Sequence, residues 1–320
     1  MNIAGNFHTH TTFCDGNNTA EEMVREALTL RFDTIGFTGH VDPPQGVAMD
    51  VSAYLAEIRR LQEAYRGQID ILRGAELDNV LSPDCAGDTE YRIGSTHFVP
   101  APGHAARDHA LSRAEAEAEQ ARLICVDYRV TDLYADCKQF YDGDFYALAA
   151  DYFRFESGVV SRTLPAFIGH FDLITRFNDL PAEEGGAFLD ETDVRYLSPA
   201  RDAMERIVRD GMRYFEVNCG ATNRGRKKEP YPCAALLRTL RELDGEVVLN
   251  ADAHDRALLA GGFAEALDLV AACGFDHVNV LTREETDVPA NNTVQDVRFT
   301  DGRERVPLFW KRTALSGLHG

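Results

Sequence analysis

Short apolar runs rich in β-branched residues alternate with amphipathic helical stretches along most of this 320-residue chain. The alternation is typical of βα units, in which a helix connects each strand to the next parallel strand. The expected strands are residues 2–8, 34–38, 70–75, 91–96, 165–169, 213–218, 246–251 and 277–281. The expected helices are residues 19–31, 51–66, 112–122, 144–157, 193–210, 231–243 and 255–273. The sequence therefore predicts an α/β fold built on a parallel sheet.

The chain shows no internal repeat, no low-complexity tract and no linker rich in Pro, Gly or Ser. We therefore expect one domain over residues 1–320. Residues 98–164 are too many for a simple βα loop, and we expect them to form an insertion or lid with two helices over one end of the sheet. Residues 292–308 have the pattern of a terminal hairpin with Asp301 and Gly302 at its turn.

The net charge of −19 disfavours binding to nucleic acids and anionic membranes, since the basic residues are dispersed. No stretch has the length and apolarity of a membrane span, and no signal peptide is evident. The seven cysteines are scattered and odd in number, which favours reduced thiols. We expect a cytoplasmic protein whose partner is a small molecule. The sequence leaves its oligomeric state open.

Potential metal ligands and other polar groups stand at the ends of seven successive expected strands. They are His8, His10, His40, Glu76, His97, His170, Glu216, Asn218, Asp252 and His254. A single histidine or acid in such a place is more commonly structural. In a βα barrel, however, all strand C-termini open on one face, where active sites are built. The joint placement therefore predicts a metal site, and mixed His and carboxylate ligation suits two or three ions of Zn, Fe or Mn.

The ordered motifs carry a family resemblance. They are H-T-H-T at 8–11, D-G at 15–16, G-H at 39–40, G-x-E at 74–76, G-S-T-H at 94–97, G-H at 169–170, E-V-N at 216–218 and D-A-H at 252–254. This series resembles the PHP superfamily, named for polymerase and histidinol phosphatase. Within it, the chain is most similar to the histidinol-phosphate phosphatases. The resemblance implies a distorted (βα)7 barrel with a trinuclear metal centre at the C-terminal ends of the strands.

The resemblance also implies a division of the ligands among the metals. One ion would be held by His8, His10, Glu76 and Asp252. Glu76 would bridge to a second ion held by His97 and His170, and the third would be held by Asp15, His40 and His254. Several relatives place a histidine where this chain has Asp15.

The activity implied is hydrolysis of L-histidinol phosphate, in histidine biosynthesis, by a metal-activated water. The expected catalytic residues are Asp252, His254 and Glu76, with either Asp252 or His254 as the proton relay to the leaving group. Arg176 and Arg224 are expected to bind the phosphate, since the guanidinium fork matches its oxygens, and Asn218 is the third expected substrate contact. Arg226 is a weaker candidate, while Lys227 and Lys228 are expected on the surface.

The amino-alcohol half of such a substrate needs an acid and an aromatic wall, and the sequence does not choose among Asp42, Asp78, Tyr141 and Phe145. Two alternative functions remain open. One is a PHP phosphoesterase acting on nucleotides or oligonucleotides, which the net charge and the lack of a basic groove disfavour. The other is a metal-stabilised interaction module without catalysis, which the complete set of nine ligands disfavours.

Overall fold

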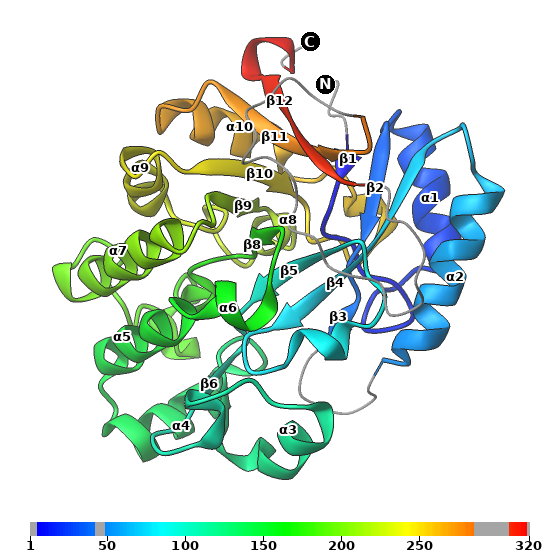
Figure 1. Ribbon diagram of the computed structural model, residues 1–320. Coiled ribbons are helices and arrows are strands. Elements are labelled where there is room, and N and C mark those ends of the chain that lie inside the picture. The colour runs from blue at the N-terminus through cyan, green and yellow to red at the C-terminus, as the bar shows by residue number, and fades with distance from the viewer. Residues whose placement is uncertain (1–4, 42–48, 285–306, 319–320) are drawn as a thin grey trace.

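The computed structural model describes residues 5–41, 49–284 and 307–318. Its centre is a parallel sheet in which neighbouring strands follow the order β1, β2, β4, β5, β8, β9, β10 and β11 (Figure 1). The strands are β1 (Gly5–Asn6), β2 (Thr34–Phe37), β4 (Asp70–Asp78), β5 (Tyr91–Ser95), β8 (Phe167–Ile168), β9 (Tyr214–Asn218), β10 (Glu246–Asn250) and β11 (His277–Thr282). Each expected strand overlaps one of these, the first being described from Gly5.

The sheet curls so that the end of its first strand, β1, lies next to the end of β10. Thr9, beyond β1, forms a parallel bridge with Ala253, beyond β10. Two backbone hydrogen bonds make this bridge, from His10 N–H to the Ala253 carbonyl (2.9 Å) and from Ala253 N–H to the His8 carbonyl (3.1 Å). The result is an α/β fold with a curled, distorted barrel whose strand C-termini face one another.

The longer helices outside the inserted segment lie around the outside of the curled sheet (Figure 1). They are α1 (Ala20–Thr29), α2 (Val51–Ala64), α7 (Val194–Arg209), α9 (Ala234–Glu242) and α10 (Phe263–Ala272). The short α8 (Gly220–Asn223) directly follows the C-terminal end of β9. Helix α1 begins with a capping box formed by Thr19 and Glu22. The start expected for α10 is wrong: residues 256–258 form one 3-10 turn and the helix begins only after Gly262, whose φ is 72°.

Large side chains fill the inside of the barrel. Tyr91 is fully buried there, and its hydroxyl donates to the Phe7 carbonyl at 2.9 Å. The ring fits because Gly36 and Gly74 lack side chains: a Cβ at either position would lie within 2.5 Å of a Tyr91 atom. This packing ties β5 to the residue directly before His8, and so helps to fix the first strand end.

The segment 98–164 is more elaborate than the two expected helices. It contains α3 (Arg113–Glu119), α4 (Val130–Tyr141), α5 (Phe145–Glu156) and α6 (Val159–Thr163), with a small antiparallel sheet of β6 (Phe98–Pro100) and β7 (Leu123–Cys125). Helix α4 was not predicted from the sequence, because its N-cap residue, Arg129, makes no side-chain capping hydrogen bond and gives no start signal. The small sheet was missed because its strands are short and 22 residues separate them.

Two further short strands were not expected. β3 (His40–Val41) pairs with β4, and β12 (Phe309–Ala314) pairs with β11 in antiparallel fashion. The expected hairpin at 292–308 lies outside the described residues except for its last two. Among the residues described, no helix is both long and apolar enough to cross a membrane, and all seven cysteines are free.

Glu156, at the end of α5, is fully buried near Thr96 and Asp78. Burial raises the pKa of Glu156 to about 8, and the charge of Asp78 adds to this effect. The carboxyl therefore stays protonated in the folded chain over a pH range, from about 4 to about 8, in which the unfolded chain ionises it. The free energy of unfolding consequently falls as the pH rises through this range.

We expect Glu156→Gln, whose side chain cannot ionise, to remove this decrease in the free energy of unfolding. The free energy of unfolding of the variant relative to the native chain should grow by about 3 kcal/mol between pH 5 and pH 8. Urea unfolding of chelator-treated protein at several pH values measures it. Parallel stability curves for the two proteins would show that Glu156 ionises freely in the folded state.

Candidate functional site

The nine expected metal ligands come together at the C-terminal ends of the strands. Glu76, in β4, lies at their centre, with both carboxylate oxygens surrounded by imidazoles. Its Oε2 lies 3.0 Å from His40 Nδ1 and 3.1 Å from His8 Nε2. Within 3.4 Å of its two oxygens lie nitrogens of His8, His10, His40, His97 and His170. One buried carboxylate therefore links five histidines, of which His8 and His10 both follow β1 and the other three lie in or just after other strands.

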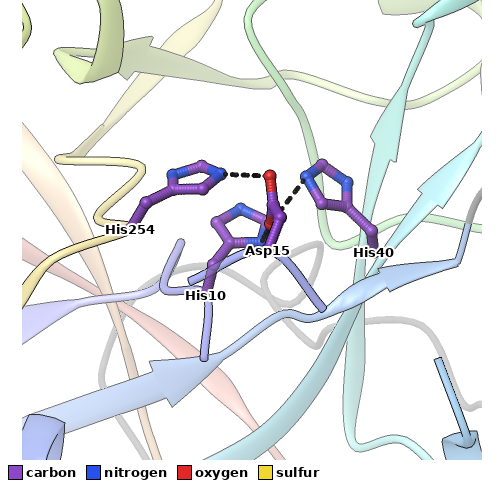
Figure 2. Close-up of side chains that lie close together, drawn as sticks. All are labelled: His10, Asp15, His40 and His254. Carbon is purple, nitrogen blue, oxygen red and sulfur yellow. Dashed lines mark ion pairs between the residues drawn. The ribbon is translucent and has the colours of Figure 1, made fainter. Parts of the chain in front are cut away.

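Asp15 gathers a second group at the outer side of the cluster (Figure 2). Its Oδ2 lies 3.1 Å from His254 Nε2, and its Oδ1 lies 3.6 Å from His40 Nε2 and 3.7 Å from His10 Nδ1. The His10 ring stacks on both other imidazoles, with centroids 4.3 Å from His40 and 4.1 Å from His254. Aspartate at this position thus reaches the same imidazoles that its expected role requires.

Asp252 connects the cluster to the last part of the barrel. Its Oδ1 lies 3.2 Å from His10 Nε2 and 3.7 Å from His8 Nε2. Its backbone is in the left-handed region, with φ of 48°, which is uncommon for a non-glycine residue. Gly220 makes room for the carboxylate, because a Cβ there would lie 2.6 Å from Asp252 Oδ2.

The charges of the cluster shift the pKa values of its members in different directions. Despite burial, Glu216, Glu76 and Asp252 hold the pKa of His8 well above its ordinary value. Despite burial, the surrounding histidines hold the pKa values of Glu76 and Asp252 well below their ordinary range. Burial, together with His254 and His40, lowers the pKa of His10 to about 3. His10 is therefore a neutral imidazole at pH 7. Ionised carboxylates beside a neutral imidazole are the protonation states in which these side chains ligate metals.

Outer partners orient the histidines. His8 Nδ1 lies 2.7 Å from Oε1 of Glu216, an oxygen that also accepts from Asn250, so that Nε2 of His8 is left to face the cluster. His97 is held similarly, by its ring Nδ1 at 3.3 Å and its backbone N–H at 2.8 Å from Oδ2 of Asp78. Carboxylate–histidine pairs of this kind accompany metal-ligating histidines and fix their tautomer.

The structure corrects the expected role of Asn218 as a substrate contact. Asn218 is fully buried and donates to Glu216 Oε2 (2.9 Å) and Asp252 Oδ2 (3.3 Å). Its own Oδ1 accepts the backbone N–H of Gly220 at 2.8 Å. Asn218 therefore hydrogen-bonds to Glu216 and Asp252 instead of lining the cavity.

The donor atoms fit divalent metal ions. Nε2 of His8, Nε2 of His10 and Oε2 of Glu76 are buried without a hydrogen bond to any described residue. The two imidazole nitrogens nevertheless lie 3.1 Å and 3.4 Å from the Glu76 oxygen. Buried polar atoms are rarely left without a partner. Four overlapping sets from the nine residues place their donor atoms within 4.8 Å, the spacing of ligands around one ion. Cations bound between these nitrogens and oxygens would offset the repulsion between their lone pairs.

A cavity of about 230 Å³ opens above the cluster. Besides seven of the nine residues, it is lined by Asp127, Leu173, Arg176, Arg224, Arg226 and Tyr231. The cavity lining thus contains Arg176 and Arg224, the two arginines expected to bind phosphate, together with Arg226. Asp127 and Tyr231 were missed. Asp127 belongs to the inserted segment, whose course the sequence did not reveal. Tyr231 was expected only as the first residue of a helix at 231–243.

Lys227 is buried, which contradicts the expected surface position. Its side chain is 2% exposed, with Nζ 3.0 Å from Thr175 Oγ1 and 3.2 Å from Glu191 Oε1. Thr175 directly precedes Arg176, and Lys227 follows Arg226. The ammonium group therefore fastens together the two loops that carry the arginines of the cavity.

Comparison with known proteins agrees with this geometry. A curated relative, a candidate histidinol-phosphatase from Schizosaccharomyces pombe, is 25% identical over 314 residues, covering 90% of this chain and 91% of its own. The histidinol-phosphatase of Bacillus subtilis is 28% identical over 191 residues, covering 53% of this chain and 66% of its own.

Solved structures share the fold. A candidate histidinol phosphatase from Listeria monocytogenes has a TM-score of 0.66 at 20% identity, covering 82% of this chain and 99% of its own. The histidinol phosphate phosphatase of Lactococcus lactis, solved with Zn, L-histidinol and phosphate, has a TM-score of 0.57 at 17% identity, covering 87% and 96%. A family model described as PHP domain matches residues 6–219, well over half of the chain. This chain therefore belongs to the PHP domain family.

Proposed function

We propose that this protein is a metal-dependent phosphatase that hydrolyses L-histidinol phosphate to L-histidinol and phosphate. The observation that carries the proposal is one cavity in which a His and carboxylate cluster lies beside three arginines. Such a site combines ligands for cations with guanidinium groups for phosphate oxygens. The full-length likeness to a candidate histidinol-phosphatase supports the substrate.

The proposed centre holds two or three ions of Zn, Fe or Mn. One set of ligands is His8, His10, Glu76 and Asp252, a second is Glu76, His97 and His170, and a third is Asp15, His40 and His254. Distances of 2.8 to 3.6 Å within the sets support ligation by these residues, and His40 also lies 3.0 Å from Glu76, so the proposed sets adjoin one another. The complex of the Lactococcus lactis protein with Zn favours zinc. When bound, such ions lower the pKa of water and neutralise phosphate oxygens.

The chain itself supplies binding, orientation and proton transfer. Arg176 and Arg224 bind the phosphate oxygens from one side of the cavity, and their Nε atoms are buried without a partner among the described residues. Asp252 and His254 are the proposed proton carriers for the leaving alkoxide. Nδ1 of His254 lies 3.0 Å from Nη1 of Arg224 and 3.0 Å from the Asp252 carbonyl, so His254 is held next to the phosphate-binding side.

We further propose that residues 1–320 form one domain based on seven βα units, with the segment 98–164 covering part of the site. Its residue Asp127 in the cavity lining supports this arrangement.

The proposed substrate is tested by phosphate release from L-histidinol phosphate by metal-loaded protein, beside nucleotides, short oligonucleotides and sugar phosphates. We expect kcat/KM for histidinol phosphate to exceed the others by several orders of magnitude. Equal, weak activity across the panel would contradict the substrate, and preference for nucleotides would favour the alternative phosphoesterase. Absence of hydrolysis with every ester and metal would favour the non-catalytic module.

Replacing either Arg176 or Arg224 by Met is expected to lower kcat/KM about 100-fold and to raise the inhibition constant of inorganic phosphate, because each removes charge-assisted hydrogen bonds to the ester. Lys at either position should restore only part of the loss, since it keeps the charge without the planar fork. The matched control is Arg209→Met, on the exposed side of α7. Unchanged phosphate inhibition in both cavity variants would remove the arginines from the site.

A further inference from the structure

Asp127 brings a carboxylate into a cavity otherwise suited to an anion. It lies two residues after β7, whose Cys125 pairs with Phe98 of β6. The backbone N–H of Val126 donates to the carbonyl of His97 at 2.9 Å. The inserted segment is therefore bound directly to a residue of the metal cluster. The pairing of β7 with β6 and the hydrogen bond of Val126 place Asp127 in the cavity lining.

The charge of Asp127 is not neutralised inside the protein. Among the described residues, its side chain makes one hydrogen bond, in which the Cys125 thiol donates to Oδ1 at 3.3 Å, and no ion pair. Three arginines line the same cavity, yet none lies within ion-pairing distance of it. A free carboxylate repels a phosphate dianion. Its presence is advantageous only if the rest of the ligand carries a positive charge.

Tyr231 adds a second unpartnered polar group to this cavity. Tyr231 is 1% exposed, and its hydroxyl has no hydrogen-bond partner in the described part of the chain. Burial above all raises the pKa of this phenol, and the charges acting on it include Arg176 and Asp127. Its ring lies edge-on to His170, with centroids 6.3 Å apart. A buried hydroxyl of this kind in a cavity wall is completed by a ligand that donates or accepts there.

We infer that Asp127 and Tyr231 form the subsite for the cationic end of the substrate, and that Asp127 makes the enzyme select phosphate monoesters that carry an ammonium group. The inference rests on the proposed function, because histidinol phosphate is such an ester. Arg176 and Arg224 hold the phosphate while Asp127 pairs with the ammonium group and the Tyr231 hydroxyl bonds the remaining polar atoms. The inserted segment is then a specificity element.

The test compares L-histidinol phosphate with the analogue in which hydrogen replaces the amino group. With Asp127→Asn, we expect kcat/KM for histidinol phosphate to fall about 100-fold, as for other truncated charge pairs. For the analogue, kcat/KM should instead rise by up to about fivefold, because a neighbouring negative charge is removed from the dianion. Inhibition by L-histidinol should weaken at least about 30-fold, while inhibition by inorganic phosphate stays equal or strengthens.

The matched control is Asp132→Asn, an exposed acid of the same segment that pairs with Arg129. Equal losses with both esters and weaker phosphate inhibition would mean that Asp127 only maintains the fold, and no change with either ester would also overturn the inference. Tyr231→Phe should weaken L-histidinol inhibition without weakening that by phosphate.

Failure of the proposed substrate is distinguishable from failure of the subsite. If the native enzyme does not hydrolyse histidinol phosphate, the same comparison uses phosphoethanolamine and ethyl phosphate. A preference for the cationic ester that Asp127→Asn abolishes would sustain the subsite alone. A native enzyme without preference for either ester would overturn it.

Discussion

Replacement of Glu76 by Gln is expected to empty the metal cluster and to lower phosphatase activity at least about 100-fold. The reason is its central position: both carboxylate oxygens face imidazoles from several strand ends, and no other acid of the cluster touches as many. Loss of an outer partner commonly costs 10- to 100-fold in metal affinity or activity, and loss of a direct bridging ligand should cost more. Gln keeps the size of the side chain but lacks the negative charge.

The measurement is metal content per chain by elemental analysis, together with kcat for histidinol phosphate. The matched control is Glu90→Gln, which removes a carboxylate just before β5, at the other end of the strands, where it pairs with Arg283. We expect the control to keep its metal and its activity. A Glu76→Gln protein that binds metal and turns over like the native enzyme would exclude Glu76 as a ligand.

The second large effect is expected from Glu216→Gln, and it combines stability with metal affinity. Glu216 is fully buried and accepts from His8 Nδ1, His170 N–H, Asn218 Nδ2 and Asn250 Nδ2, at 2.7 to 3.0 Å. An amide at this position points its own N–H groups at some of these donors. Breaking a buried charge pair in this way typically destabilises a protein by about 3–5 kcal/mol. His8 would also lose the partner that directs its Nε2 to the cluster.

We therefore expect Glu216→Gln to lower the free energy of unfolding by about 3 kcal/mol and the metal affinity by about 10- to 100-fold. Urea unfolding without metal and metal titration separate the two effects. Glu246→Gln is the matched control, since Glu246 also pairs with a histidine, His277 at 2.7 Å, but where β10 begins. It should be destabilised with unchanged metal affinity. Native metal affinity in Glu216→Gln would refute the orienting role.

The cluster could be predicted from the sequence because parallel strands have a simple geometric property. Their C-termini lie at one face, so polar residues that end successive apolar runs must meet, whatever the details of packing. His8, Glu76 and His170 meet for this reason, although 161 residues lie between the first and the last. The alternation of apolar runs and helical stretches sufficed for the α/β class on the same grounds.

Residues placed by non-local packing were beyond sequence reasoning. Asp127 enters the cavity because β7 pairs with β6 and Val126 bonds to His97, and neither contact has a local signal. Lys227 is one of several charges in a basic run of the sequence, yet in the fold it is buried, with Nζ bonded to Glu191 and Thr175. Asn218 was placed at the correct strand end, but the side to which its amide turns depends on Glu216.

The central claim is that the His and carboxylate cluster performs phosphate-ester hydrolysis through bound metal ions. The most direct measurement is phosphate release from L-histidinol phosphate while chelator-stripped protein is titrated with Zn²⁺ or Mn²⁺. We predict no turnover without metal, a rise with each addition, and a plateau at two or three ions per chain. Full turnover by protein that retains less than about one tenth of an ion per chain would contradict the account.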